Sequence, residues 1–204
     1  MNRAAPSDLA ELAVEVHAET FFQEAVTVAI EQRRAEASPA STAYLVALLA
    51  DHARGVALLG DDEPFGLRLA RAMQTSGGER FLRLRALGDD VLFFSGFFAQ
   101  HLERRGVDLD YAAGLGQVAY GGAASVLRGH SRQTLPVFEE LAERFTLFVS
   151  LLQDVSDGLQ TRAARDQLDI LALYERWARS RSDVLARELA KVGLIPHRKT
   201  NGLN

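Results

Sequence analysis

Residues 79–105 read ERFLRLRALGDDVLFFSGFFAQHLERR, and this stretch decides the fold. Its apolar residues recur at spacings of three and four, which is the period of an α-helix. Leu84 and Val91 lie on one face of this helix, while Phe93 and Phe94 lie on others. A helix that is apolar all round is typically buried. We therefore expect residues 79–105 to form the central helix of the fold.

The rest of the chain shows the same helical period, and no segment alternates strictly between apolar and polar residues as a strand would. Capping residues, glycines and prolines divide it into about seven or eight helices. We expect them at about residues 7–37, 42–54, 64–75, 79–105, 109–128, 134–158 and 164–179, with a last one that begins at Ser182. The sequence thus predicts an all-α bundle around a buried central helix.

Length and composition indicate one helical domain. The chain has 204 residues, of which 48% are hydrophobic, so it can bury a sizeable core. We expect a single domain over residues 1–196, in which residues 1–37 could form a loosely attached helical segment. Residues 197–204 are polar, and we expect them to form a flexible tail.

Charge and cysteine content exclude several functions. The chain has 23 lysine and arginine residues against 27 acidic residues, and a net charge of -4 argues against binding to nucleic acid. It has no cysteine, which excludes disulfides, thiolate nucleophiles and cysteine-ligated metals. No histidine follows a glutamate by three residues, so the metal site of helical carboxylate proteins is not predicted either. We expect no metal, no cofactor and no nucleic-acid partner.

The longest run without a charged residue is Tyr111–Leu127. It contains several glycines, and it is too short and too weakly apolar to cross a lipid bilayer. The first residues of the chain lack the apolar core of a signal peptide. We therefore expect a cytoplasmic protein that has no membrane partner.

The helix expected at residues 109–128 carries a ridge of small side chains. The ridge consists of Ala112, Gly116, Ala119 and Ala123. A glycine inside a helix costs about 1 kcal/mol relative to alanine, so several glycines require a compensating gain. Close approach of a neighbouring backbone is the simplest such gain, and we expect it from residues 79–105. An adjoining face carries Tyr111 and Val118, and Tyr111 is expected at the core or its rim.

Asp89 and Asp90 stand beside the phenylalanines of the central helix. Consecutive side chains on a helix point about 100° apart, so we expect the two carboxylates to have different surroundings. The structural interpretation is that one is buried as a hydrogen-bond acceptor or ion-pair partner and the other lies at the rim. The functional alternative is a carboxylate with a raised pKa that acts as an acid or base in an apolar pocket.

Five residues are candidates for lining such a pocket, between the helices expected at 42–54, 79–105 and 109–128. They are Asp89, Asp90, His52, Ser95 and Tyr120. Polar and titratable groups among aromatic side chains are typical of small-ligand sites. His52 lies on the apolar stripe of its helix, so the alternative for this residue is a core histidine with satisfied hydrogen bonds. No residue is assigned a catalytic role.

Several segments share a pattern with other proteins. Residues 44–50 read YLVALLA, residues 87–98 begin with LGD and end with SGFF, residues 105–108 read RGVD, residues 119–120 read AY, and residues 173–177 read LYERW. These segments resemble a family of all-helical bacterial proteins that has no assigned activity. The resemblance implies a cytoplasmic bacterial protein and no catalytic residue. The family has a double tyrosine where this chain has Tyr111-Ala112, so Tyr111 is not carried over as a site residue.

The sequence favours a non-enzymatic interaction or regulatory module, because no phosphate loop, dinucleotide motif or nucleophile elbow is present. Its ligand would be a protein partner or a second copy of the chain, bound through helix faces. The candidate partner surface is the acidic row Glu11, Glu15 and Glu19 in the first helix. The alternative is a helical enzyme or a small-ligand-binding protein, which requires Asp89 and Asp90 not both to lie at the surface.

Overall fold

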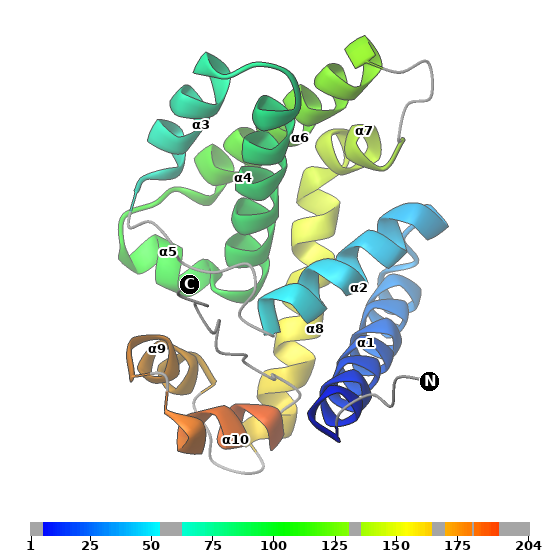
Figure 1. Ribbon diagram of the computed structural model, residues 1–204, viewed down its shortest axis with the longest axis vertical. Helices are drawn as coiled ribbons and strands as arrows, with labels where there is room; N and C mark the ends of the chain where they lie inside the picture. Colours follow the sequence, from blue (N-terminus) through cyan, green and yellow to red (C-terminus); the bar gives the residue numbers. More distant parts are fainter. Residues whose placement is uncertain (1–5, 54–62, 131–135, 165–169, 181, 192–204) are drawn as a thin grey trace.

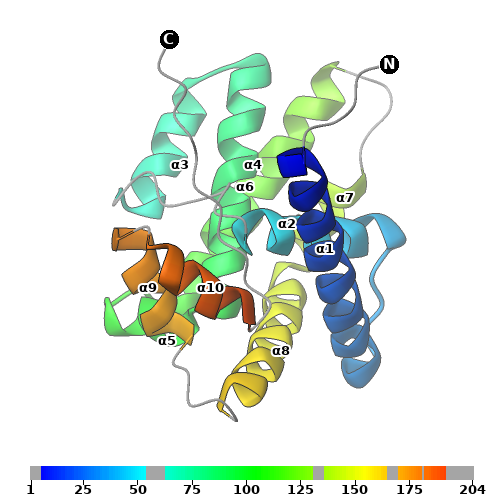
Figure 2. The ribbon, with the colours of Figure 1, turned by 60° about the horizontal axis from the view of Figure 1, so that its bottom comes forward.

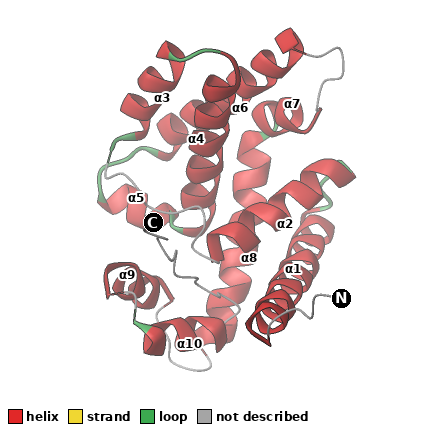
Figure 3. Ribbon diagram, viewed as in Figure 1, coloured by secondary structure: helices red, strands yellow, loops and turns green. Residues whose placement is uncertain are grey.

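The computed structural model describes residues 6–53, 63–130, 136–164, 170–180 and 182–191, and this part of the chain is helical with no strand (Figure 3). Its helices are α1 (Pro6–Arg33), α2 (Pro39–Ala53), α3 (Phe65–Gln74), α4 (Gly77–Phe97), α5 (Ala99–Arg104), α6 (Leu109–His130), α7 (Pro136–Glu143), α8 (Phe145–Ala164), α9 (Ile170–Ser180) and α10 (Asp183–Lys191). The predicted all-α class is confirmed for these residues. The number of helices exceeds the prediction because two expected helices are each divided.

The first division falls at Phe98, between α4 and α5. Phe98 has φ -133° and ψ 34°, which lies outside the helical region, although its N–H still bonds to the carbonyl of Phe94. Its ring packs against Tyr174 of α9, with ring centroids 5.7 Å apart. The pair Ser95-Gly96 stands just before this point, and such a pair can mark a kink, but the expected helix at 79–105 continued through it.

The second division falls at Arg144, between α7 and α8, which run in different directions (Figure 1). Backbone hydrogen bonds continue into and out of this residue, from Arg144 to Glu140 and from Phe148 to Arg144. The apolar stripe also continues across it, with Leu141 and Phe145 both buried. The prediction of one helix at about 134–158 is therefore wrong, since α7 and α8 are separate helices. The helical period continues through the bend, so the pattern of apolar residues does not mark the division.

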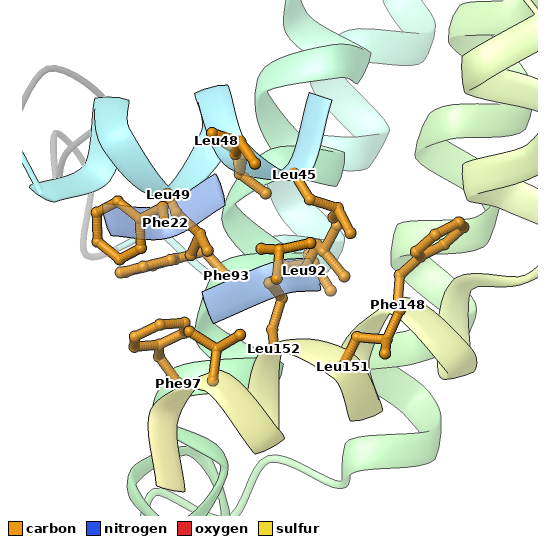
Figure 4. Close-up of a cluster of buried hydrophobic side chains, with 14 of the residues drawn as sticks. Phe22, Leu45, Leu48, Leu49, Leu92, Phe93, Phe97, Phe148, Leu151 and Leu152 are labelled. Atoms are coloured by element: carbon orange, nitrogen blue, oxygen red, sulfur yellow. The ribbon is translucent and has the colours of Figure 1, made fainter. Parts of the chain in front are cut away.

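The helix α4 lies at the centre of the fold, as predicted. It contacts α2, α3, α5, α6 and α8. Figure 4 shows its Leu92 and Phe93 among leucines of α2 and α8 and Phe22 of α1. Leu92 has no exposed surface, and Phe93 is 2% exposed. A polar residue at the middle of α4 is therefore surrounded by neighbouring helices.

The closest neighbour of α4 is α6, which crosses behind it in the view of Figure 1. A Cβ atom placed on Gly88 would lie 2.7 Å from the ring of Tyr120, and one on Gly122 would lie 2.9 Å from Leu84. The ridge residues Ala112, Ala119 and Ala123 have no exposed surface. These distances confirm the predicted close packing of the two helices.

The helices α1 and α2 lie side by side on one flank, while α9 and α10 lie together near α5 (Figures 1 and 2). Phe22 of α1 and Trp177 of α9 both belong to the main hydrophobic cluster. Arg33 of α1 forms a bidentate ion pair with Asp154 of α8. Residues 1–5 and the predicted tail at 197–204 lie outside the described residues.

A carboxylate from α7 holds the start of α2. Glu140 accepts hydrogen bonds from the backbone N–H of Ser38 at 3.0 Å and from the Ser41 hydroxyl at 2.8 Å. Burial acts to raise the pKa of Glu140, but these hydrogen bonds and nearby Arg144 outweigh it and hold the pKa below its usual value. Glu140 thus supplies an acceptor for the unpaired donors at a helix N-terminus.

Candidate functional site

The two aspartates of α4 lie at nearly the same depth. Their side chains are 14% exposed at Asp89 and 16% exposed at Asp90. The expected contrast between a buried and a rim carboxylate is therefore not found. Their partners do differ, as the 100° rotation between consecutive helical residues requires.

Asp89 accepts two tyrosine hydroxyls on one oxygen. Tyr44 of α2 donates to its Oδ1 at 2.5 Å, and Tyr120 of α6 donates to the same atom at 2.8 Å. The Nε of Arg85 lies 3.5 Å from Oδ2 and also donates to the Tyr44 hydroxyl at 3.1 Å. The Arg85 guanidinium lies over the Tyr44 ring, 5.6 Å from its centroid. This cluster joins α2, α4 and α6.

The surroundings shift the acidity of the groups in this cluster. Burial raises the pKa of Asp89, and it outweighs the opposing hydrogen bonds from Tyr44 and Tyr120 and the charge of Arg85. Burial, followed by the charge of Asp89, raises the pKa of both tyrosines. The hydroxyls therefore stay protonated and act as donors to Asp89.

Asp90 faces α2 and α3 instead. Arg68 of α3 donates to its Oδ2 at 2.5 Å, and the Nε2 of His52 lies 3.5 Å from its Oδ1. The His52 ring is fully buried and stacks on Phe93, with centroids 4.0 Å apart. Its Nδ1 lies 2.8 Å from the carbonyl oxygen of Leu48, so Nδ1 carries the proton and Nε2 has no hydrogen bond among the described residues.

The structure thus places four of the five predicted pocket residues in two contact groups, Asp89 with Tyr120 and Asp90 with His52. Ser95 lies apart from them. Its hydroxyl is buried and has no hydrogen bond within the described part of the chain, and its carbonyl accepts from Gln153 of α8.

Sequence reasoning missed two partners of these groups, Tyr44 and Arg68. It does place Arg85 beside Asp89, because the two stand four residues apart on one helix. Tyr44 stands four residues before Leu48 on the stripe that leads to His52, so the helical period could have placed it on the inner face of α2.

The described residues include no group of three or more histidine, aspartate or glutamate side chains that could hold a metal ion. Asp89 and Asp90 are instead paired with hydroxyl and guanidinium donors. Of the predicted acidic row, Glu19 is exposed, while the side chains of Glu11 and Glu15 lie outside the described residues.

A second surface stands out on α6, on the side turned away from α4. We call it the outer face of α6 and define it by Tyr111, Gly114, Val118, Gly121 and Ser125. Tyr111 is 58% exposed and Val118 is 52% exposed. These residues recur at alternating intervals of three and four, which places them along one stripe over about four turns. The stripe lies within the run Tyr111–Leu127, which has no charged residue.

Neighbouring helices border this face on both sides. The Tyr111 hydroxyl lies against Gly66 of α3, where a Cβ atom would be 2.7 Å from it. On the other side, a Cβ on Gly121 would have Ala142 of α7 as its nearest neighbour, at 3.8 Å. A Cβ on Gly114 would have no atom of the described residues within 4 Å. The face is therefore an open strip of helix between α3 and α7.

The exposure of Tyr111 and Val118 corrects the sequence interpretation, which placed Tyr111 at the core or its rim. The signal in the sequence that could have indicated this surface is the length of the uncharged run Tyr111–Leu127. None of the described helices has both the length and the apolar character needed to cross a membrane. The uncharged stripe is therefore a surface feature of a helix that packs on α4 with its opposite side.

Comparison with known proteins gives no relative from which a role could be transferred: no protein-family model, no curated protein and no solved structure matches the chain.

Proposed function

We propose that this protein is a helical interaction module that docks a protein partner on the outer face of α6. The observation that carries this proposal is an exposed helix face of about four turns without a charged side chain. Solvent-facing sides of helices normally carry charged and polar residues. An apolar exposed strip bordered by polar residues is typical of a surface that another protein covers.

The composition of the face suits helix docking. Tyrosine is enriched among the residues that dominate binding energy, and Tyr111 is the most exposed large apolar side chain of α6. Glycine at positions 114 and 121 allows a partner backbone to approach closely, because no side chain stands between. An amphipathic helix laid along this strip would contact residues spaced at three and four.

The acidic row Glu11, Glu15 and Glu19 remains a second predicted partner surface. Glu19 is exposed and is therefore accessible to a partner. A cytoplasmic, regulatory role for the module likewise remains a prediction of the sequence.

Site-specific photo-crosslinking in cells tests the proposal. A photo-reactive amino acid replaces Val118, and in the control it replaces Val28, which is 47% exposed on α1. We expect a discrete crosslinked species from position 118 and none from position 28. Equal labelling at both positions, or no discrete product at position 118, would refute docking at this face.

A second candidate function is binding of a small polar ligand beside Asp89. The observation in its favour is that Asp89 and Asp90 are both mostly buried, each held by donors from other helices. The side chain of Arg85 is 43% exposed and extends this cluster to the surface. Its Nε lies against Tyr44 and Asp89, and a guanidinium has four further N–H donors that could bind a carboxylate or phosphate.

Native mass spectrometry distinguishes this candidate from docking. The protein is mixed with the low-molecular-mass fraction of a lysate and compared with Arg85→Gln and with Arg71→Gln, whose arginine pairs with Glu63 away from this cluster. A bound small molecule that is lost only in Arg85→Gln would support ligand binding. Spectra without any bound small molecule would reject it.

A further inference from the structure

We infer that the partner on the outer face of α6 is α6 of a second copy of this chain, packed antiparallel about a twofold axis near residue 119. This inference rests on the proposed function, because it names the occupant of the same face. Three features of α6 carry it: the order of large and small residues, the positions of the charges at its ends, and the helix dipole.

The outer face is complementary to itself when one copy is reversed. In an antiparallel pair centred near residue 119, positions whose numbers add to about 238 lie at the same height. Val118 then meets Gly121 of the second copy, and Gly114 meets Ser125. The large side chain nearest the axis, Val118, thus faces a glycine, and small residues meet on either side of it, which lets the two helices approach closely. A parallel pair would instead set Tyr111 against Tyr111.

The charges that bound the uncharged strip have opposite signs. Asp110 precedes the strip and Arg128 follows it, and both are exposed. They are 18 residues apart, or about five helical turns, so they lie on the same edge of α6. A twofold axis perpendicular to the helices brings Asp110 of each copy beside Arg128 of the other. Two opposite-charge pairs then close the two ends of the interface.

Arg128 has donors for such a pair. Its Nη1 donates to Glu139 of α7 at 2.5 Å. A guanidinium carries five N–H donors, so one arginine can bind two carboxylates. The antiparallel arrangement also sets the positive N-terminal end of each α6 near the negative C-terminal end of the other. A parallel pair would place Asp110 beside Asp110, which is repulsive.

Sedimentation velocity of the full chain over a concentration series tests self-association. We expect a reversible dimer whose dissociation constant rises at least about tenfold in Val118→Arg, because a charge at the centre of the interface cannot be solvated there. The matched control is Val28→Arg, at an exposed position of α1, and it should leave the dimer unchanged. Circular dichroism of each variant confirms that its helices are intact.

A charge exchange tests the direction of the pair. Asp110→Arg and Arg128→Asp should each weaken the dimer by about three- to tenfold, since each turns two attractive contacts into repulsive ones. The double variant restores opposite charges at both ends and should return the dissociation constant to within about threefold of the original. Additive weakening in the double variant would overturn the antiparallel arrangement.

Cysteine crosslinking tests the register, since the chain has no cysteine of its own. Chains with Gly114→Cys and Ser125→Cys are mixed and oxidised. In the proposed dimer positions 114 and 125 of different copies lie at the same height, whereas two copies of position 114 are about 15 Å apart along the axis. We expect the mixed disulfide to dominate. Dominant like-with-like disulfides would contradict the inference.

These results separate the two proposals. A protein that stays monomeric in sedimentation overturns the second-copy inference. A crosslinked product from position 118 whose mass differs from that of two chains would then still support docking of a different protein. A dimer that is insensitive to Val118→Arg overturns the inference as well. A crosslinked product of twice the chain mass from position 118, none from position 28, and the mixed disulfide together support both.

Discussion

Replacing Gly88 with alanine should destabilise the protein by about 1.5–5 kcal/mol, even though alanine favours a helix by about 1 kcal/mol. The new Cβ would lie 2.7 Å from two carbon atoms of the Tyr120 ring, where ordinary contact begins at 3.4 Å. The ring is fully buried and its hydroxyl is held 2.8 Å from Asp89, so it cannot move aside without weakening that bond.

The magnitude follows from these contacts. Overpacking a filled core costs about 1–3 kcal/mol, and a weakened hydrogen bond to a charged group costs about 1.5–3 kcal/mol. The gain in helix propensity offsets about 1 kcal/mol of this total. Gly158→Ala is the matched control, because a Cβ there has no neighbour within 4 Å in the part of the chain that the structure describes. It should stabilise the protein by about 0.5–1 kcal/mol.

Urea unfolding, followed by the fluorescence of Trp177, measures both changes. This is the only tryptophan of the chain, and it is 1% exposed, so unfolding moves it into water. In a Tyr120→Phe background the cost of Gly88→Ala should fall, since the ring is no longer held by its hydroxyl. If Gly88→Ala proves as stable as Gly158→Ala, the close packing of α4 and α6 at this point is wrong.

Two further predictions concern pH, and one concerns a helix cap. Asp89→Asn should gain stability relative to the original chain as pH rises above 3.8, because the raised pKa of Asp89 makes its ionisation unfavourable in the folded state. Thermal unfolding at several pH values measures this difference. If burial did not dominate the pKa of Asp89, the difference would not grow with pH. Glu140→Gln should cost about 1–2 kcal/mol at pH 7 through the lost hydrogen bonds at the start of α2. The pKa of Glu140 in the folded state lies below 4.5. The cost of Glu140→Gln should therefore vanish as pH falls below 4.5 and the carboxylate of the original chain becomes protonated. A cost that does not depend on pH would contradict the role of the charge.

The sequence predicted the helical class and the central position of α4, because a helix that is apolar on every side has to be buried. It could not predict the break at Phe98. That residue leaves the helical conformation where it packs on Tyr174, which lies far along the chain. The bend at Arg144 was hidden for a similar reason, since the stripe of buried residues continues through it.

The polar cluster shows where helical periodicity is sufficient and where it is not. Periodicity separated Asp89 from Asp90 and placed His52 on the inner side of α2, and the structure agrees on both. It could not pair Asp89 with Tyr44, because that contact depends on the distance between two helices. The function class remains a proposal, as does the role of each residue in the cluster.

The outer face of α6 illustrates the opposite error. Alternation of apolar and small residues made both sides of this helix suitable for burial, so the pattern alone could not tell which side packs on α4. The side with Ala112 and Ala119 fits against α4 and is fully buried, whereas Val118 is left in solvent. Among the described residues, the side with Ala112 and Ala119 is covered by the chain itself, and the side with Val118 is the one that we propose a partner covers.

The most direct measurement of the central claim is the ¹⁹F NMR spectrum of the protein labelled with fluorotyrosine. The four tyrosines give separate resonances, and only Tyr111 lies more than half exposed among them. Over a roughly hundredfold dilution, the Tyr111 resonance should move toward that of solvent-exposed tyrosine while those of Tyr120 and Tyr174 stay fixed. The assignment of this face would be contradicted if the Tyr111 resonance stayed at the position of solvent-exposed tyrosine at every concentration, and also after addition of the partner that is crosslinked at position 118.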